Sequence, residues 1–260
     1  MNSKEKPLIL VTNDDGITAP GVRALIKMMN EIGEVYVVAP DGPQSGMGHA
    51  ITINSTLFCE KMKIDDGAQS DREWACSGTP VDCVKLAITR ILPRKPDLCV
   101  SGINHGSNSS INVIYSGTMS AAVEAGIDGI PSIGFSLCDF SYHADFFAAE
   151  DYLKKIVLEA IDKSMPKGMV LNVNIPKLPK SELKGIKVCR QAKAVWVEDY
   201  DERKDPRGRT YYWLTGEFKN LDKGEDTDER ALSEGFISVV PIQYDMTAYH
   251  FIKEMNNWEL

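Results

Sequence analysis

The sequence predicts an α/β protein with a Rossmann-like, doubly wound and mostly parallel sheet. Three observations predict it: a branched apolar run at 7–12, an amphipathic helical pattern at 20–32, and a second apolar run at 34–40. Strand, helix and strand in this order form a βαβ unit, which places the two strands parallel in one sheet. With 260 residues, 43% of them hydrophobic, the chain is long enough to bury a large core.

The first helix is predicted from its apolar spacing and from its start. Pro20 stands near the first turn, where a missing backbone N–H costs nothing. Apolar side chains then recur at i, i+3, i+4 and i+7, which puts them on one face of a helix. These residues are Val22, Leu25, Ile26 and Met29.

The same alternation continues to about residue 176. The predicted elements are one or two strands in 51–64, a turn at 65–71, a helix at 79–92, a strand at 97–102, a polar loop at 103–118, a helix at about 118–128, a strand at 131–137, a helix at 145–163 and a strand at 169–176. Short branched runs without polar alternation are typical of parallel strands that are buried on both faces.

The pattern changes after about residue 190, so we expect a Rossmann-like catalytic core over 1–190 and an arm over 191–260. The arm begins with a hairpin at 193–218 around the turn "DPRG", and ends with a strand at 235–247 and a short helix at 248–255. We expect the strand, at about 235–242, to return to the core. Four aromatic residues on the hairpin favour a contact between subunits: Trp196, Tyr211, Tyr212 and Trp213.

Composition excludes some classes of function. The net charge of −8 argues against a stable complex with nucleic acid, which usually needs a basic surface. The six cysteines are scattered without a CxxC pair, so buried free thiols in a reducing compartment are expected. The N-terminal apolar stretch is too short for a signal peptide and no run is long enough to span a membrane, which predicts a cytoplasmic protein without membrane contact.

Polar residues follow three of the predicted strands. Asp14 and Asp15 come after the first strand, Ser45 after the second, and Asn104 after the strand at 97–102. In a doubly wound sheet these loops meet at one edge, where ligands bind. Two adjacent carboxylates repel each other unless a cation lies between them, and Mg²⁺ or Mn²⁺ prefers such oxygen ligands. The alternative is structural, because "NDDG" is a common turn and an aspartate before a helix is often its N-cap.

A second group of residues could bind phosphate. Ser116, Gly117 and Thr118 begin a predicted helix, whose first N–H groups attract anions. A plain serine or threonine cap explains them equally well, and we favour that explanation for the similar string "CSGTP" at 76–80. His105 in "GINHGSN" could act as an acid or base, although a lone loop histidine is more often simply solvated. The sequence lacks the GxGxxG, GxxxxGK[ST] and GxSxG motifs, so a dinucleotide fingerprint, a P-loop and a nucleophile elbow are absent.

Together these motifs resemble the SurE family of stationary-phase survival proteins, which are metal-dependent 5′/3′-nucleotidases. The matching strings are "ILVTNDDGITAPGVRAL", "VVAPDGPQSGMGHAIT", "CSGTPVDCVKLA", "PDLCVSGINHGSN" and "YSGTMSAAVEAG", with weaker matches in "DPRGRTYYWLTGE", "DTDERALSEGFISVVPIQ" and "MTAYHF". They follow the order of the family over nearly the whole chain. His49 is an unassigned departure from the expected pattern.

The resemblance implies a fold, a site and a reaction. It implies one divalent cation per subunit, Mg²⁺ or Mn²⁺, held by Asp14, Asp15, Ser45 and Asn104. It implies phosphate binding by Gly106, Asn108, Ser116, Gly117 and Thr118. It also implies hydrolysis of nucleoside 5′- and 3′-monophosphates, and of short polyphosphate in some members, by a homodimer or homotetramer that exchanges its C-terminal arm.

We expect Asp14 and Asp15 to be the catalytic residues, with Asp14 also handling the proton of the attacking water. A covalent aspartyl-phosphate route is the less supported alternative. A non-catalytic nucleotide-binding module is the alternative from another class, and only the enzyme would release free phosphate. A Rossmann-type dehydrogenase is disfavoured because the glycine fingerprint is missing.

Overall fold

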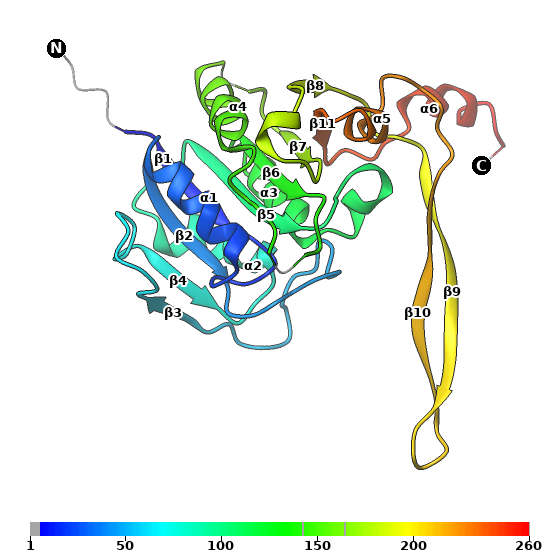
Figure 1. Ribbon diagram of the computed structural model, residues 1–260, viewed down its shortest axis with the longest axis horizontal. Helices are drawn as coiled ribbons and strands as arrows, with labels where there is room; N and C mark the ends of the chain where they lie inside the picture. The colour runs from blue at the N-terminus through cyan, green and yellow to red at the C-terminus, as the bar shows by residue number, and fades with distance from the viewer. Residues whose placement is uncertain (1–5, 142, 164, 260) are drawn as a thin grey trace.

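The computed structural model describes residues 6–141, 143–163 and 165–259. Within these ranges the chain forms a nine-stranded sheet and a separate two-stranded hairpin (Figure 1). The order across the sheet is β3 (Cys59–Met62), β4 (Glu73–Cys76), β2 (Glu34–Pro40), β1 (Leu8–Thr12), β5 (Leu98–His105), β6 (Ser132–Leu137), β7 (Met169–Ile175), β11 (Ile237–Gln243) and β8 (Ile186–Val188). The predicted mostly parallel α/β fold is confirmed.

The order of the strands reverses at β1. This strand pairs in parallel with β2 on one side and with β5 on the other, and the parallel pairing continues through β6 to β7. The loops that follow β1, β2 and β5 therefore leave the sheet at the same edge, beside the point where the order reverses. In doubly wound sheets this is the place where ligands bind.

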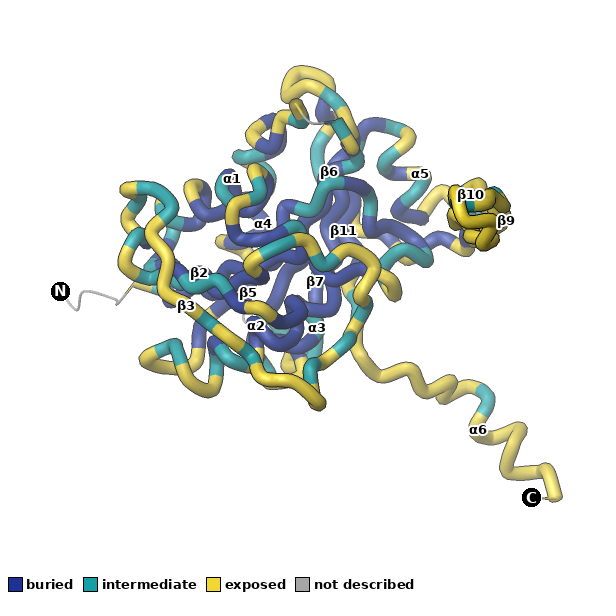
Figure 2. Tube along the Cα trace, turned by 90° about the horizontal axis from the view of Figure 1, so that it is seen from below, coloured by how far each residue is buried: buried dark blue, intermediate teal, exposed yellow. Residues whose placement is uncertain are grey.

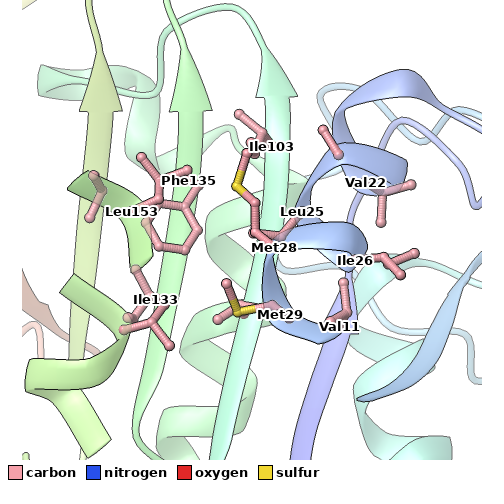
Figure 3. Close-up of a cluster of buried hydrophobic side chains, with 14 of the residues drawn as sticks. Val11, Val22, Leu25, Ile26, Met28, Met29, Ile103, Ile133, Phe135 and Leu153 are labelled. Atoms are coloured by element: carbon pink, nitrogen blue, oxygen red, sulfur yellow. The ribbon is translucent and has the colours of Figure 1, made fainter. Parts of the chain in front are cut away.

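Helices cover both faces of the sheet. α1 (Pro20–Asn30) and α4 (Glu150–Asp162) contact each other and share one apolar cluster, while α2 (Pro80–Leu86) and α3 (Gly117–Ile127) share another (Figure 2). The four residues predicted for the inner face of α1 are at most 1% exposed, and they meet β-strand residues such as Val11 and Ile133 (Figure 3). Each such side chain contributes about 1.5–3 kcal/mol by leaving water.

Several predicted elements have different bounds in the structure. The helix expected at 79–92 ends as α2 at Leu86 and continues as a π-helical turn, Ala87–Ile91, while the helix expected at 145–163 begins only at Glu150. The polar loop expected at 103–118 contains the end of β5 and a 3₁₀ helix, Ser110–Ile114. The sequence analysis missed β4, β8 and α5 (Asp228–Ser233), which are too short for a clear periodic pattern.

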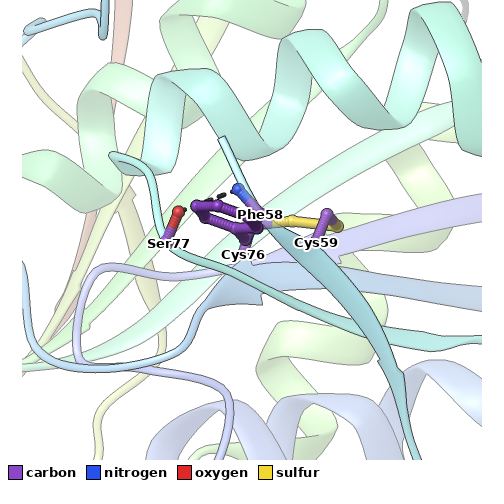
Figure 4. Close-up of a disulfide and its surroundings, with 4 residues drawn as sticks. All are labelled: Phe58, Cys59, Cys76 and Ser77. Atoms are coloured by element: carbon purple, nitrogen blue, oxygen red, sulfur yellow. Dashed lines mark hydrogen bonds between the residues drawn. A yellow bond between two sulfur atoms is a disulfide. The ribbon is translucent and has the colours of Figure 1, made fainter. Parts of the chain in front are cut away.

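The expectation that all six cysteines are free is wrong. Cys59 and Cys76 form a disulfide, whereas Cys83, Cys99, Cys138 and Cys189 are free thiols (Figure 4). β3 pairs antiparallel with β4 in a register that puts these two cysteines opposite each other. The pairing depends on a strand register that their separation of 17 residues does not reveal.

The C-terminal segment forms the predicted hairpin and then returns to the sheet. β9 (Ala194–Lys204) and β10 (Thr210–Asn220) pair antiparallel along their full length and project away from the sheet (Figures 1 and 2). β11 then pairs antiparallel with β7, which makes it part of the main sheet. α6 (Tyr249–Met255) follows and has no buried residue.

None of the described helices has the length and apolar character needed to cross a membrane. The first five residues, which form part of the N-terminal stretch considered for a signal peptide, lie outside the described ranges.

A buried ion pair ties α1 to β4 and provides a test of the fold. Both terminal nitrogens of Arg23 donate to the carboxylate of Glu73, at 2.8 and 2.9 Å, and the Glu73 side chain has no exposed surface. Glu73→Ala leaves the guanidinium without its main partner, so we expect the free energy of unfolding in urea to fall by about 3 kcal/mol. Lys180→Ala breaks an exposed pair with Asp151, which water screens, and should have a much smaller effect. Equal effects of the two substitutions would contradict this assignment.

Candidate functional site

The turn after β1 holds the two adjacent carboxylates. Asn13 donates from its side chain to the carbonyl of Gly16 at 2.9 Å, and Gly16 adopts a positive φ of 98°. A Cβ at Gly16 would lie 3.2 Å from the backbone of Gly42, in the loop after β2. Glycine therefore allows the turn to pack closely against the neighbouring loop, and Asp14 and Asp15 are held at the edge of the sheet.

Asp14 is buried against the first turn of α3. The hydroxyl of Thr118 donates to its Oδ1, and a Cβ on Gly117 would lie 2.7 Å from the Asp14 Cβ. The pKa of Asp14 is raised from 3.8 to about 6, mainly by burial and to a smaller extent by the negative charge of Asp15, while the hydrogen bond from Thr118 lowers it. The carboxyl group thus changes its charge near neutral pH.

Asp15 lies beside Asp14 in the same turn, and Asn104 lies near the end of β5. The backbone N–H of His105 donates to Asp15 Oδ2 at 3.2 Å, and burial raises the pKa of Asp15 above its ordinary value despite this bond. Asn104 donates its Nδ2 to the carbonyl of Gly106 at 2.8 Å, while its Oδ1 lies 3.4 Å from the hydroxyl of Thr118. The amide oxygen of Asn104 and the carboxylate of Asp14 therefore both lie near the Thr118 hydroxyl.

An irregularity in β5 contributes to this position of Asn104. The pairing of β5 with β6 shifts register between Ser101 and Asn104. Such a bulge changes the direction of the side chains that follow it. Nothing in the alternation of the sequence signals the shift.

Ser45 belongs to an exposed loop that is tied to the site at several points. The N–H of its neighbour Gln44 donates to the backbone carbonyl of Asp14 at 2.7 Å. Further along the loop, the Nε2 of His49 lies 2.8 Å from a carboxylate oxygen of Glu124 on α3. Thr52 donates from both its N–H and its hydroxyl to Asp82 on α2. His49, which had no assigned role, thus connects the Ser45 loop to α3.

The two Ser-Gly-Thr strings begin helices, as predicted. At α2, Thr79 and Asp82 form a reciprocal capping box, which supports the cap explanation for that string. At α3, the hydroxyl of Ser116 accepts a hydrogen bond from the N–H of Met119 at 3.0 Å. Ser116 therefore caps α3, and its side chain also lines the pocket described next.

These loops surround a pocket of about 780 Å³. Six of the residues predicted for metal or phosphate binding line it: Asp14, Asp15, Ser45, Asn104, Asn108 and Ser116. The other three lie next to lining residues: Gly117 and Thr118 contact Asp14, and Gly106 lies against the ring of Phe140. The side chain of Asn108 donates to Ser136 and its N–H to Asn174, so it is anchored to β6 and β7.

The pocket also includes residues that the sequence analysis did not connect with the site. They are Gly46, Ser109, Asn112, Tyr115, Phe140, Trp196, Phe218 and Glu229, while His105 and Ser107 belong to the "GINHGSN" loop already considered. Trp196 was expected at a subunit contact, yet its indole N–H donates to Asn112 at 2.8 Å and its ring meets Phe218 edge-on at 5.6 Å. The only signal for Tyr115 was its place next to the Ser-Gly-Thr string.

His105 is not simply solvated. Its Nε2 is buried without a hydrogen-bond partner among the described residues, and its ring packs against Phe146 with 5.0 Å between the ring centres. The backbone of His105 serves the site by bonding Asp15, whereas its side chain packs against an aromatic ring.

The charges of the pocket are of one sign. Three carboxylates line it, those of Asp14, Asp15 and Glu229, and the described lining contains no lysine or arginine. The predicted metal ligands are two carboxylates, one hydroxyl and one amide oxygen, which is the donor chemistry that Mg²⁺ and Mn²⁺ prefer. Among the described residues, no group of three or more His, Cys, Asp or Glu side chains is placed to hold a metal. The fit to a hard divalent cation thus rests on the mixed oxygen donors of Asp14, Asp15, Ser45 and Asn104.

Comparisons with known proteins give one consistent result. A family model described as "Survival protein SurE" matches residues 9–198. The 5′-nucleotidase SurE of Flavobacterium psychrophilum is 68% identical over 255 residues, which cover 98% of each chain. That of Christiangramia forsetii is 65% identical over 258 residues, which cover 99% of each chain. The crystal structure of the SurE protein from Aquifex aeolicus matches with a TM-score of 0.82 and 39% identity, covering 96% of this chain and 98% of that one.

The raised pKa of Asp14 predicts how the stability of the protein depends on pH. Without a cation, protonated Asp14 contributes stability that is fully present below pH 3.8 and lost as the pH rises through about 6. A bound cation favours the charged form, so Mn²⁺ should raise Tm at pH 7.5 and have little effect at pH 5. Thermal melts with and without Mn²⁺ at both values measure this, with Asp14→Asn as the control that removes the titrating group. An equal Mn²⁺ effect at both values would contradict the role given to Asp14.

Proposed function

Because the chain belongs to the SurE family, we propose that it is a 5′-nucleotidase that hydrolyses nucleoside 5′-monophosphates to nucleoside and phosphate. One observation carries the proposal: a pocket rich in carboxylates, without a lysine or arginine in its described lining, adjoins the first turn of α3. The names of the relatives at 65–68% identity support the same activity. We extend the proposal to 3′-monophosphates and short polyphosphate on the family resemblance alone.

The proposed cofactor is one divalent cation per subunit, Mg²⁺ or Mn²⁺, held by Asp14, Asp15, Ser45 and Asn104. These side chains line the pocket, and the amide oxygen of Asn104 and the carboxylate of Asp14 both lie near the Thr118 hydroxyl. When bound, such an ion neutralises phosphate charge and lowers the pKa of water that it binds. Without it, a phosphate dianion would enter a pocket whose ionisable side chains are mainly acidic.

The residues of this chain bind and orient the phosphate from the other side. The first turn of α3 carries the partial positive charge of the helix, and Ser116 lines the pocket there. Gly117 and Thr118 pack against Asp14, and Gly106 packs against the ring of Phe140, so these three residues support the lining without forming it. Asn108 holds the loop between β5 and α3 by its hydrogen bonds to β6 and β7. We propose that this loop and this helix end form the phosphate cradle.

Asp14 is the proposed proton acceptor. Hydrolysis forms a bond from a water oxygen to phosphorus and breaks the bond from phosphorus to the ester oxygen, so one proton must leave the water and one must reach the nucleoside. The pKa of about 6 describes the cation-free carboxyl group, and a bound cation would favour its charged form. The proposed role therefore rests on the position of Asp14 in the pocket beside Asp15 and Asn104. Thr118 donates to Asp14 Oδ1 and fixes the orientation of the group.

The central test is the release of phosphate from AMP by purified protein with Mn²⁺. Asp14→Asn should lower kcat/KM at least about 100-fold, because it removes a charged ligand and the proton acceptor together. Its Tm without cation should not fall, since a buried charge is replaced by a neutral amide of similar shape. Asp41→Asn, at an exposed acid after β2, is the matched control and should keep full activity.

A non-catalytic nucleotide-binding module makes the opposite prediction for this assay. It would bind AMP and release no phosphate, whether or not a chelator is present. Phosphate release that stops with the chelator and returns with Mn²⁺ supports the enzyme.

We propose that the arm assembles the protein into a homodimer or homotetramer in the cytoplasm. The hairpin projects away from the sheet and is exposed along most of its length (Figures 1 and 2). Its side chains Tyr200, Tyr212 and Trp213 are each 59–60% exposed. Apolar patches of this kind are typical of protein contacts. The cytoplasmic location is proposed from the sequence. One of its arguments was that all six cysteines are free, and the Cys59–Cys76 disulfide removes that argument.

Light scattering after gel filtration measures the assembly. We expect a mass of two or four times 28.8 kDa. Replacing both Tyr212 and Trp213 with serine should lower that mass or make it depend on concentration, because apolar contact area is lost. The matched control is Lys219→Ser on the same hairpin. A monomeric parent protein would refute the assembly and leave the proposed reaction untouched.

A further inference from the structure

One charged residue of the pocket has no role in the proposed reaction. Glu229 lies in the first turn of α5, far along the chain from the metal ligands, and its side chain lines the same pocket as Asp14 and Asp15. The hydroxyl of Ser109 donates to its Oε1, and Ser109 lies 2.6 Å from the hydroxyl of Ser107. The carboxylate is thus connected by two hydroxyls to the loop proposed to bind phosphate.

The position of Glu229 is fixed by its neighbour Asp228. The Asp228 side chain has no exposed surface and accepts from the N–H of Ser110 at 2.7 Å and from the N–H of Ala192 at 2.9 Å. These bonds join α5 to the β5–α3 loop and to the start of the hairpin (Figure 1). The carboxylate of Glu229 is therefore a fixed part of the pocket wall.

Within the described part of the chain, Glu229 has no cationic partner. None of the described ion pairs involves Glu229, and the charge that acts on it is the negative charge of Asp228. The proposed cation would compensate Asp14 and Asp15, whereas the side-chain contact of Glu229 is the hydroxyl of Ser109. The pocket therefore combines the aromatic residues Phe140, Trp196 and Phe218 with one carboxylate that has no described cationic partner.

We propose that Glu229 is a specificity-determining residue that favours phosphate esters of an uncharged alcohol over substrates in which a second phosphate follows the reacting one. This rests on the proposed function, because the reacting phosphate must lie between the carboxylate pair and α3. In AMP the next group is a ribose, which is neutral. In ADP or tripolyphosphate the next group is another phosphate, which a nearby carboxylate repels, and more strongly in a partly buried pocket than in water.

The test compares substrates within one variant, so that differences in folded fraction cancel. We measure kcat/KM for phosphate release from AMP, ADP and tripolyphosphate at pH 8, with free Mn²⁺ held constant because polyphosphates bind it. Glu229→Gln keeps the shape and removes the charge. It should raise the ratio of kcat/KM for tripolyphosphate to kcat/KM for AMP about tenfold. The ratio of kcat/KM for ADP to that for AMP should also rise.

Glu225→Gln is the matched control, since it removes the same charge from an exposed position four residues earlier. Its ratios should equal those of the parent protein. If Glu229→Gln leaves the ratios unchanged, or if both variants raise them equally, Glu229 does not set specificity. A lower Tm with unchanged ratios would mean that Glu229 serves only as an acid in the first turn of α5 and would overturn the proposal.

A binding measurement separates this inference from the proposed reaction. Calorimetry with the Mn²⁺-loaded protein compares pyrophosphate with inorganic phosphate. The affinity for pyrophosphate should rise about tenfold relative to phosphate in Glu229→Gln only. If AMP is not hydrolysed but this shift occurs, the reaction is refuted and the charge selection holds. If AMP is hydrolysed and neither ratio changes, the reaction holds and the selection is refuted.

Discussion

The arrangement of the site depends on one contact, that of the Asp14 carboxyl group with the first turn of α3. Thr118 donates to Asp14, and the absence of a side chain at Gly117 lets the helix approach the carboxyl group closely. Burial at this contact raises the pKa of Asp14, while the hydrogen bond and the helix end partly offset the cost of its charge. The same contact therefore positions a proposed metal ligand, tunes its proton affinity and brings the phosphate-binding helix end beside it.

The sheet makes that contact possible because its order reverses at β1. The loops after β1, β2 and β5 converge without any direct sequence link, and hydrogen bonds then join them in pairs: Gln44 to Asp14 and His105 to Asp15. Both donors are backbone N–H groups, so neither bond depends on the side chain at position 44 or 105. Asp15, by contrast, accepts with its carboxylate, so this side chain both holds a loop and serves as a proposed metal ligand.

Much of this was predictable from the sequence, and the limits have physical causes. The inner face of α1 follows from the spacing of Val22 to Met29, because burial imposes a helical period on the residues. The convergence of Asp14 and Asn104 follows from the rule for doubly wound sheets. The register of β3 against β4, the bulge before Asn104 and the entry of Glu229 into the pocket could not be predicted. They depend on pairings between distant segments, and neither periodicity nor turn chemistry records such pairings.

The residues that line the pocket come from two parts of the chain. The carboxylate pair, Asn104 and the end of α3 belong to the parallel sheet and its first loops, whereas Trp196, Phe218 and Glu229 come from the hairpin and the helix after it. Asp228 joins the two by bonding both Ser110 and Ala192. The proposed chemistry therefore lies with the core, and the surface that meets the rest of a substrate lies with the arm. Since β11 is held in the main sheet by β7, changes in the arm can alter that surface without moving the carboxylates.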